Sequence, residues 1–133
     1  KPVEYADFSL RMDRAMRVVQ RRAGKSLTIP TADGLRVVGL RDVLYVDILR
    51  HDLYYHVTGG EVLRNRGSLT QLEEQLVPEG FVRVSASHLV NMAQVTRVRA
   101  GSVEMSDGEE IGFGRSRKRQ ALETLSAYIG GSI

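Results

Sequence analysis

From Gly24 onward the chain consists of short hydrophobic segments with a period of two, separated by tight-turn signals. This pattern limits the possible folds more than any other feature of the sequence. Runs such as "VLYVDIL" and "EVLRNRG" alternate side chains as a half-buried strand does. Asp33-Gly34 and Asp107-Gly108 suit hairpin turns, and Gly59-Gly60 marks another turn. Because the strands do not alternate with long helices, a Rossmann-like sheet is disfavoured. The pattern predicts a mainly β, antiparallel domain with small helices.

A helix is predicted before these strands, over residues 4–23. Its apolar residues recur at steps of three and four, and Gly24 stands where a helix-ending glycine is expected. One apolar stripe on a single helix needs a partner in water, either the rest of the chain or a second copy. The residues expected to supply that contact are Phe8, Met12, Met16 and Val19.

Two more helices are predicted further along the chain. Ser68, followed three residues later by Gln71, forms a capping box that opens the short helix "LTQLEEQL". Residues 115–128 are predicted as a C-terminal helix closed by Gly130-Gly131.

Composition excludes several classes of protein. A chain of 133 residues that is 42% hydrophobic suits a single core, and it does not begin with Met, so a fragment of a longer protein is expected. No apolar run reaches the roughly 18–20 residues that span a bilayer. The absence of Cys excludes disulfides and favours a cytoplasmic location. His51, His56 and His88 lack the spacing of a metal site, and no nucleophile elbow is present, so we expect no metal, no cofactor and no enzyme.

The positive charge is concentrated in places, although the net charge is only +3. Clustered cations separated by neutral or acidic sequence are typical of proteins that neutralise phosphates at chosen positions. One cluster lies in the N-terminal segment and the other near the end of the chain: Arg11, Arg14, Arg17, Arg21, Arg22 and Lys25, then Arg115, Arg117, Lys118 and Arg119.

Arg50-His51 interrupts two strand-like segments. The pair forms either a polar loop tip without a ligand or a loop that reaches a base edge or a phosphate.

The stretch "GFGRSRKRQ" places four cations at the predicted start of the C-terminal helix. Helix starts prefer acidic residues, because the helix dipole carries partial positive charge there. An anion would offset this arrangement, and we expect Arg115, Ser116, Arg117 and Lys118 to bind one.

The stretch "FVRVSASHLVNMAQV" contains a small polar run, Ser85-Ala86-Ser87-His88. Small hydroxyl side chains allow a backbone to approach a bulky partner such as DNA. Alternatively, Ser85 or Ser87 caps a short helical piece, "HLVNM". The two interpretations are compatible.

Several motifs, in this order, resemble the LytTR family of DNA-binding domains: "DVLYVDI", "YYHVTGG", "RGSLTQLEEQL", "FVRVSASHLVNMAQV" and "SVEMSDGEEIGFGRSRKRQALETL". The resemblance covers about Ser26 to Ile129 and predicts a LytTR DNA-binding domain over residues 25–133. It implies elongated antiparallel β-sheets with inter-strand loops that enter successive major grooves of bent DNA.

The resemblance also implies three contact regions: Arg50-His51, Ser85-Ala86-Ser87 and Gly114-Arg115-Ser116. Ala86 stands where relatives often carry a polar side chain, so Arg83 or His88 could take over polar contacts in the second region. Asn91 matches a family position to which we assign a structural role, tying the turn.

Residues 1–24 resemble the end of a receiver domain, with Lys1-Pro2 after its last strand and a final helix and linker following. The resemblance implies the output half of a two-component response regulator. It would bind promoter DNA as a homodimer on direct repeats and be controlled by a sensor histidine kinase through the receiver. The alternative is a protein-interaction module whose basic patches bind an acidic partner.

Overall fold

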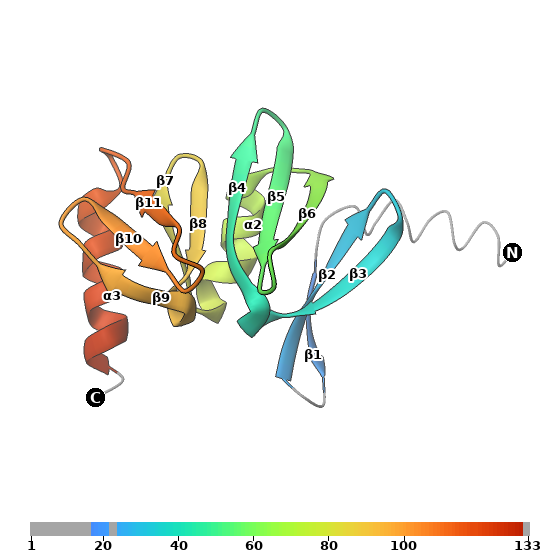
Figure 1. Cartoon of the computed structure of the whole chain (residues 1–133), viewed down its shortest axis with the longest axis horizontal. Helices are drawn as coiled ribbons and strands as arrows, with labels where there is room; N and C mark the ends of the chain where they lie inside the picture. Colours follow the sequence, from blue (N-terminus) through green and yellow to red (C-terminus); the bar gives the residue numbers. More distant parts are fainter. Residues whose placement is uncertain (1–16, 22–23, 132–133) are drawn as a thin grey trace, which may run out of the picture.

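Three antiparallel sheets set side by side make up the structure, a computed structural model that describes residues 17–21 and 24–131 (Figure 1). The central sheet has five strands in the order β6-β5-β4-β8-β7. Its members are β4 (Val43–Leu49), β5 (Asp52–Val57), β6 (Glu61–Arg66), β7 (Phe81–Ser85) and β8 (His88–Asn91). The elongated, mainly β fold predicted from the sequence is confirmed.

A three-stranded sheet flanks the central sheet at each end of the molecule. One contains β1 (Arg17–Arg21), β2 (Gly24–Thr31) and β3 (Gly34–Gly39). The other contains β9 (Val95–Val98), β10 (Ser102–Met105) and β11 (Glu110–Gly112). The predicted turns at Asp33-Gly34 and Asp107-Gly108 join β2 to β3 and β10 to β11.

Two helices complete the described part of the chain, together with short 3-10 turns at Leu40–Asp42, Val77–Glu79 and Met92–Gln94. Helix α2 spans Leu69–Leu76, and α3 spans Lys118–Gly131 beside β7. The Ser68 cap predicted for α2 is confirmed, since its hydroxyl accepts from the Gln71 N–H at 3.3 Å. Neither of these helices is long and apolar enough to cross a membrane.

Apolar side chains form two cores, one on each face of the central sheet. The first contains Tyr55 and Phe81 of the sheet, with Leu72 and Leu76 of α2 and buried residues of β2 and β3. The second packs Val82 and Val90 against β10, β11 and α3. Each fully buried side chain of this size contributes about 1.5–3 kcal/mol. The central sheet is thus covered on both faces near β7 and β8.

A β-bulge at the end of β7 adjusts the side chains next to the following turn. The register shifts between Arg83 and Ser85, so Val84 is the extra residue, and it is buried in the second core. Bulges of this kind bend a strand and redirect its side chains.

The predicted helix over residues 4–23 is wrong for Arg17–Arg21, which form strand β1 paired with β2. The β-branched pair Val18-Val19 favours a strand, and Val18 packs beside the first core. Gly24 therefore begins β2 and does not end a helix. Residues 4–16, with Phe8, Met12 and Met16, lie outside the described residues.

Two further predictions about helices need correction. The piece "HLVNM" is not helical, because His88–Asn91 is strand β8. Leu89 is buried in one core and Val90 in the other, so the strand lacks the polar alternation that would have revealed it. The C-terminal helix begins at Lys118 instead of Arg115, and Gly130 and Gly131 belong to it.

Candidate nucleic-acid interface

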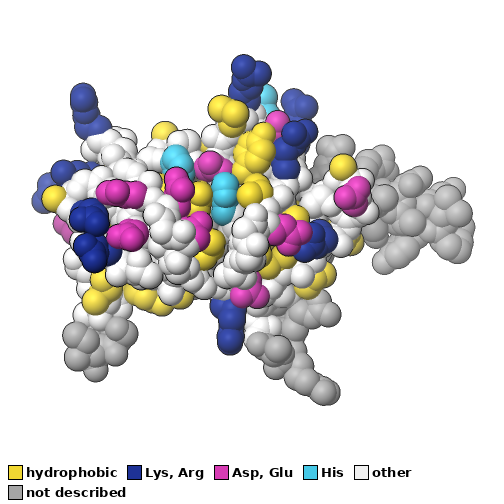
Figure 2. Space-filling view, in the orientation of Figure 1, with side chains coloured by type: hydrophobic (Ala, Val, Ile, Leu, Met, Phe, Trp, Pro, Cys, Tyr) yellow, Lys and Arg dark blue, Asp and Glu magenta, His cyan; other side chains and the backbone are white. Residues whose placement is uncertain are grey.

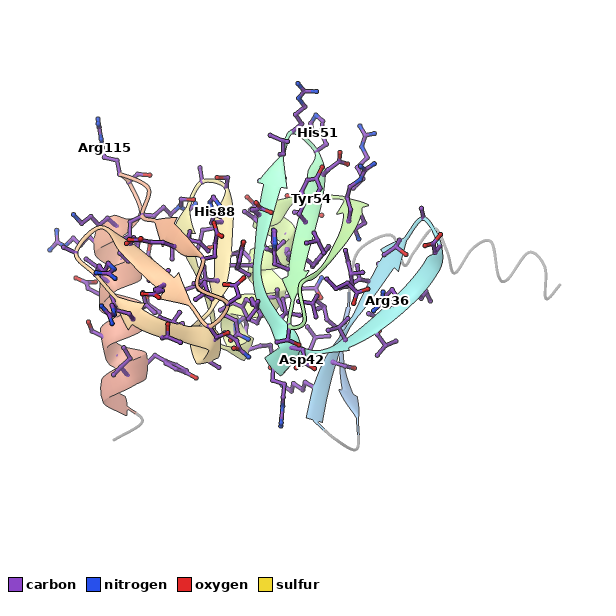
Figure 3. The ribbon with its side chains drawn as sticks, viewed as in Figure 1. Arg36, Asp42, His51, Tyr54, His88 and Arg115 are labelled. Atoms are coloured by element: carbon purple, nitrogen blue, oxygen red, sulfur yellow. The ribbon has the colours of Figure 1, made fainter. Side chains whose placement is uncertain are left out.

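The three loops singled out in the sequence lie along one edge of the molecule. The β4–β5 turn, the β7–β8 turn and the segment before α3 all reach the upper edge in Figure 1. His51 and Arg115 project from this edge in Figure 3, and His88 lies just below the β7–β8 turn. We call this the loop edge: Arg50-His51, Ser85–His88 and Gly114–Arg117.

The first loop is a two-residue hairpin turn, with Leu49 paired to Asp52 across it. Arg50 has φ +61°, the one non-glycine residue with positive φ in the described part of the chain. Such a conformation costs an arginine roughly 1–3 kcal/mol and is concentrated at functional sites. Arg50 and His51 are exposed, as is the apolar Leu49 (64%).

The second loop is organised around His88. The hydroxyls of Ser85 and Ser87 lie 3.0 and 3.2 Å from His88 Nδ1, and the Ser87 N–H donates to Ser85 Oγ. The pKa of His88 is lowered, chiefly because burial disfavours the imidazolium. A neutral ring that accepts a hydroxyl proton at Nδ1 carries its own proton on Nε2. Both serine hydroxyls thus lie within hydrogen-bonding distance of one ring nitrogen, whose role as donor or acceptor is set by the tautomer of the ring.

Arg83 supports this loop from inside the molecule. Its side chain is buried, with Nε and Nη2 donating to the carbonyls of Ser85 (2.9 Å) and Ala86 (2.6 Å). Its Nη1 donates to Glu73 Oε1 of α2 at 2.7 Å. With these donors engaged, Arg83 holds the shape of the turn.

The third loop is bonded to the second. The Gly114 N–H donates to the Val84 carbonyl at 2.8 Å. A Cβ on Gly114 would lie 3.0 Å from Ser85 Cα, which requires a glycine at this approach. Arg117 Nη1 also reaches Glu73, at 3.5 Å. Gly114 and Glu73 thus couple two of the predicted contact regions.

Arg115 and Ser116 are exposed in the turn that precedes α3. The helix starts later than predicted, so Arg115, Ser116 and Arg117 lie ahead of it and Lys118 is its first residue. Neither Arg115 nor Lys118 pairs with an acidic side chain in the described part of the chain.

Asn91 has the structural role expected of it. The side chain is buried; its Nδ2 donates to the carbonyls of Leu40 (3.2 Å) and Val43 (2.9 Å), and its Oδ1 accepts from the Ala93 N–H. These bonds tie the end of β8 to the start of β4.

Most cations in or next to the loop edge lack an acidic partner, with Arg117 and the buried Arg83 as exceptions, whereas most of the other cations have one. Among described side chains, those with acidic partners within 4 Å are Lys25, Arg36, Arg83, Arg97, Arg99, Arg117 and Arg119. Those without are Arg41, Arg50, Arg64, Arg66, Arg115 and Lys118. Apart from Arg41, in the turn before β4, these unpaired cations belong to the loop edge or to the elements next to it, and Figure 2 shows Lys and Arg side chains crowding the upper edge.

Arg64 and Arg66 of β6 were not singled out from the sequence. Their signal is the alternation in "EVLRNR", which places both on one face of a strand. Their position beside the His51 loop depends on the pairing of β5 with β6, which the sequence does not specify.

Behind the loop edge, ring and carboxylate groups share one face of the central sheet. Tyr45 stacks on His56 with ring centroids 4.1 Å apart, and His56 Nε2 lies 3.1 Å from Asp47 Oδ1. Burial, aided by nearby carboxylates, raises the pKa of Tyr45 to about 12. Within the described ranges, no group of three or more His, Cys, Asp or Glu residues is arranged to hold a metal ion.

Comparison with known proteins identifies the family. The sequence model of the LytTr DNA-binding domain matches residues 33–126. The chain belongs to the LytTR family. This family is defined by DNA binding and not by an enzymatic reaction, and the match covers all three loops of the loop edge.

A solved structure agrees with this assignment at the level of the fold. It is the LytTr DNA-binding domain of a Bacillus cereus protein described as a methyl-accepting/DNA response regulator. The two share 21% identity with a TM-score of 0.65, and the match covers 75% of this chain and 95% of that one. No curated protein matches the chain.

Proposed function

We propose that this LytTR domain is a sequence-specific transcription regulator that reads promoter DNA through its loop edge. The observation that carries the proposal is the grouping of three loops on one edge, two of which carry unpaired cations (Arg50 and Arg115), while most cations elsewhere have an acidic partner. A protein that binds a polyanion gains most where its own carboxylates do not compete for the cations.

We assign different roles to the residues of the edge. Arg50, His51 and Arg115 are exposed and free to reach base edges or phosphates. Ser85, Ser87 and Ser116 bring small hydroxyl groups close to the DNA, with His88 fixing the serine geometry. Lys118 and Arg117 add phosphate attraction, and Arg83 acts indirectly by holding the β7–β8 turn.

Two separated protrusions suit two successive grooves. The β4–β5 turn is one, and the joined β7–β8 and pre-α3 loops form the other (Figure 1). Insertion of both into major grooves requires the intervening DNA to bend, a deformation that costs a few kcal/mol and adds selectivity.

The wider context extends this proposal. We infer an output domain of a two-component response regulator, with residues 1–24 continuing from a receiver domain. Phosphorylation by a sensor histidine kinase in the cytoplasm would then promote a homodimer on repeated sites. The support is the Lys1-Pro2 segment and the LytTR domain that follows it.

Selection from a random duplex pool tests the function, followed by affinity measurements at two salt concentrations. We expect enrichment of a short repeated element that binds at least about 1000-fold more tightly than random DNA. Enrichment of no element, with weak and salt-sensitive binding alone, would instead favour the acidic protein partner.

A further inference from the structure

The outer face of β6 carries two unpaired cations next to the first loop. Arg64 lies opposite Tyr54 and Arg66 opposite Asp52 in the β5–β6 pairing. Residues two apart on a strand share a face, so both guanidinium groups emerge from the same side of the sheet. Both are exposed, and neither has an ion pair or hydrogen bond among the described side chains.

The end of β6 is attached to the His51 loop. The Gly67 N–H donates to the His51 carbonyl at 2.9 Å. A Cβ at Gly67 would lie 2.8 Å from Leu53 Cδ1, so the chain after Arg66 passes close to β5. The position of Arg66 is therefore fixed relative to the loop that we propose to enter a major groove.

An open groove of about 660 Å³ lies beside β6 and is lined by Arg64, Asn65 and Arg66 of this strand. Pro30, Thr31 and Ala32 of the β2–β3 hairpin form one wall, and Arg64 and Arg66 form the other. Asp52 is the one carboxylate among its lining residues.

Another carboxylate, Glu61 of β6, does not neutralise Arg64 or Arg66. Glu61 is held by Arg36 of β3 in a two-point ion pair, with N–O distances of 2.6 and 3.0 Å. This pair also lowers the pKa of Glu61 and raises that of Arg36. Arg36 of the hairpin and Glu61 of β6 thus neutralise each other, and Glu61 does not pair with Arg64 or Arg66.

We propose that Arg64 and Arg66 form a phosphate-binding strip that extends the DNA interface beyond the His51 loop. The strip would grip the backbone flanking the groove that this loop enters, without reading bases. Two residues of a strand span about 6.8 Å. Because phosphates of one DNA strand follow about every 3.4 Å along the axis, each guanidinium can meet a different phosphate. This inference rests on the proposed function.

The test compares the full chain with Arg64→Gln/Arg66→Gln on the selected duplex and on random DNA. Loss of two phosphate contacts should reduce the slope of log K against log salt by about 1.8, with about 30-fold weaker binding at 0.15 M salt. The ratio of specific to random affinity should stay the same. Thermal unfolding should be unchanged, since both side chains are exposed and unpaired.

A charge-matched control removes two arginines elsewhere. The control is Arg97→Gln/Arg99→Gln, in β9 and just after it, where both cations pair with Glu104. It should leave the slope of log K against log salt close to that of the parent. An unchanged slope in the β6 variant, a change equal to the control, or an altered base preference would each overturn the strip. The slope of log K against log salt can also be measured on random DNA, so the strip can be tested even if the selection enriches no duplex. Failure of the strip is therefore distinguishable from failure of the proposed function.

Discussion

Arg115 is the side chain on which direct reading of DNA depends most. It is exposed and unpaired among described side chains, and it follows Gly114, whose backbone N–H donates to the Val84 carbonyl. We expect Arg115→Ala to cost about 1–3 kcal/mol on the selected site, because a guanidinium contact to a base or phosphate is lost. Arg119→Ala, which removes a cation paired within α3, is the control and should cost much less. If Arg115→Ala binds the selected site as tightly as the parent, Arg115 does not contact the DNA.

Arg50 combines backbone strain with an exposed charge, which allows stability and binding to be separated. Arg50→Gly should raise the free energy of unfolding by roughly 0.5–1 kcal/mol, because glycine adopts φ +61° without a steric cost, while its larger loss of chain entropy on folding offsets part of that gain. Arg50→Ala keeps the strain and should not stabilise the fold. Both substitutions should weaken DNA binding to a similar extent. Urea denaturation and titration with the selected duplex measure the two effects, and an Arg50→Gly variant with full affinity would contradict a contact by this residue.

His88 gives the fold a pH dependence of known sign. Its pKa lies below the ordinary 6.5, through burial and the nearby His56, although Asp47 and Glu109 act in the opposite direction. A lowered pKa in the folded state means that this contribution to stability is complete above the unfolded value and declines as pH falls through the folded one. We expect part of the loss of unfolding free energy between about pH 7 and 5 to disappear in His88→Gln. His51→Gln at the exposed tip is the comparison, and identical pH profiles for His88→Gln and the parent would exclude His88.

At the scale of elements, α2 positions two loops that it does not itself form. Glu73 accepts from Arg83, which braces the β7–β8 turn, and reaches Arg117 ahead of α3. A single carboxylate on a helix thereby links the second and third loops of the loop edge.

The direction in which Glu73→Gln changes DNA affinity shows whether Glu73 positions the loops or acts only through its charge. Removal of an acidic charge should strengthen binding to a polyanion. We expect Glu73→Gln to weaken DNA binding instead, because Arg83 and Arg117 lose their partner, and to lower stability by about 1–3 kcal/mol. Glu74→Gln, an exposed neighbour on α2, should bind DNA as tightly as the parent or slightly more so. Stronger binding by both variants would show that Glu73 does not position the loops.

Strand and turn chemistry made much of the fold predictable. "VLYVDIL" corresponds residue for residue to β4, and the Ser68 cap stands at the start of α2. The prediction failed at β8, where burial on both faces removes the alternation, and at β1, where apolar spacing also suits a helix. Local sequence patterns carry no information about which face of a segment another part of the chain covers.

The candidate site was predictable as a set of loops but not as an arrangement. The resemblance marked Arg50-His51, Ser85-Ala86-Ser87 and Gly114-Arg115-Ser116, yet the burial of Arg83 depends on Glu73, ten residues away in sequence. Arg64 and Arg66 became candidates only when strand pairing placed them beside His51. Such relations arise from long-range packing, which residue spacing does not encode.

At the scale of the whole molecule, the central sheet acts as a platform that holds its turns at fixed separation. Two cores, one on each face, secure it against α2 and against β9–β11 with α3. Loops mounted on such a rigid platform can match two grooves without reorganising, which reduces the entropy lost on binding.

Mapping the contact surface on the protein tests the central claim most directly. The full chain, labelled with ¹⁵N, would be titrated with the selected duplex while its amide shifts are followed. The largest changes should fall at Arg50-His51, Ser85–His88 and Gly114–Ser116, with small changes across β9 and β10. Changes centred on β9 and β10, with the three loops unaffected, would contradict the loop edge as the DNA-reading surface.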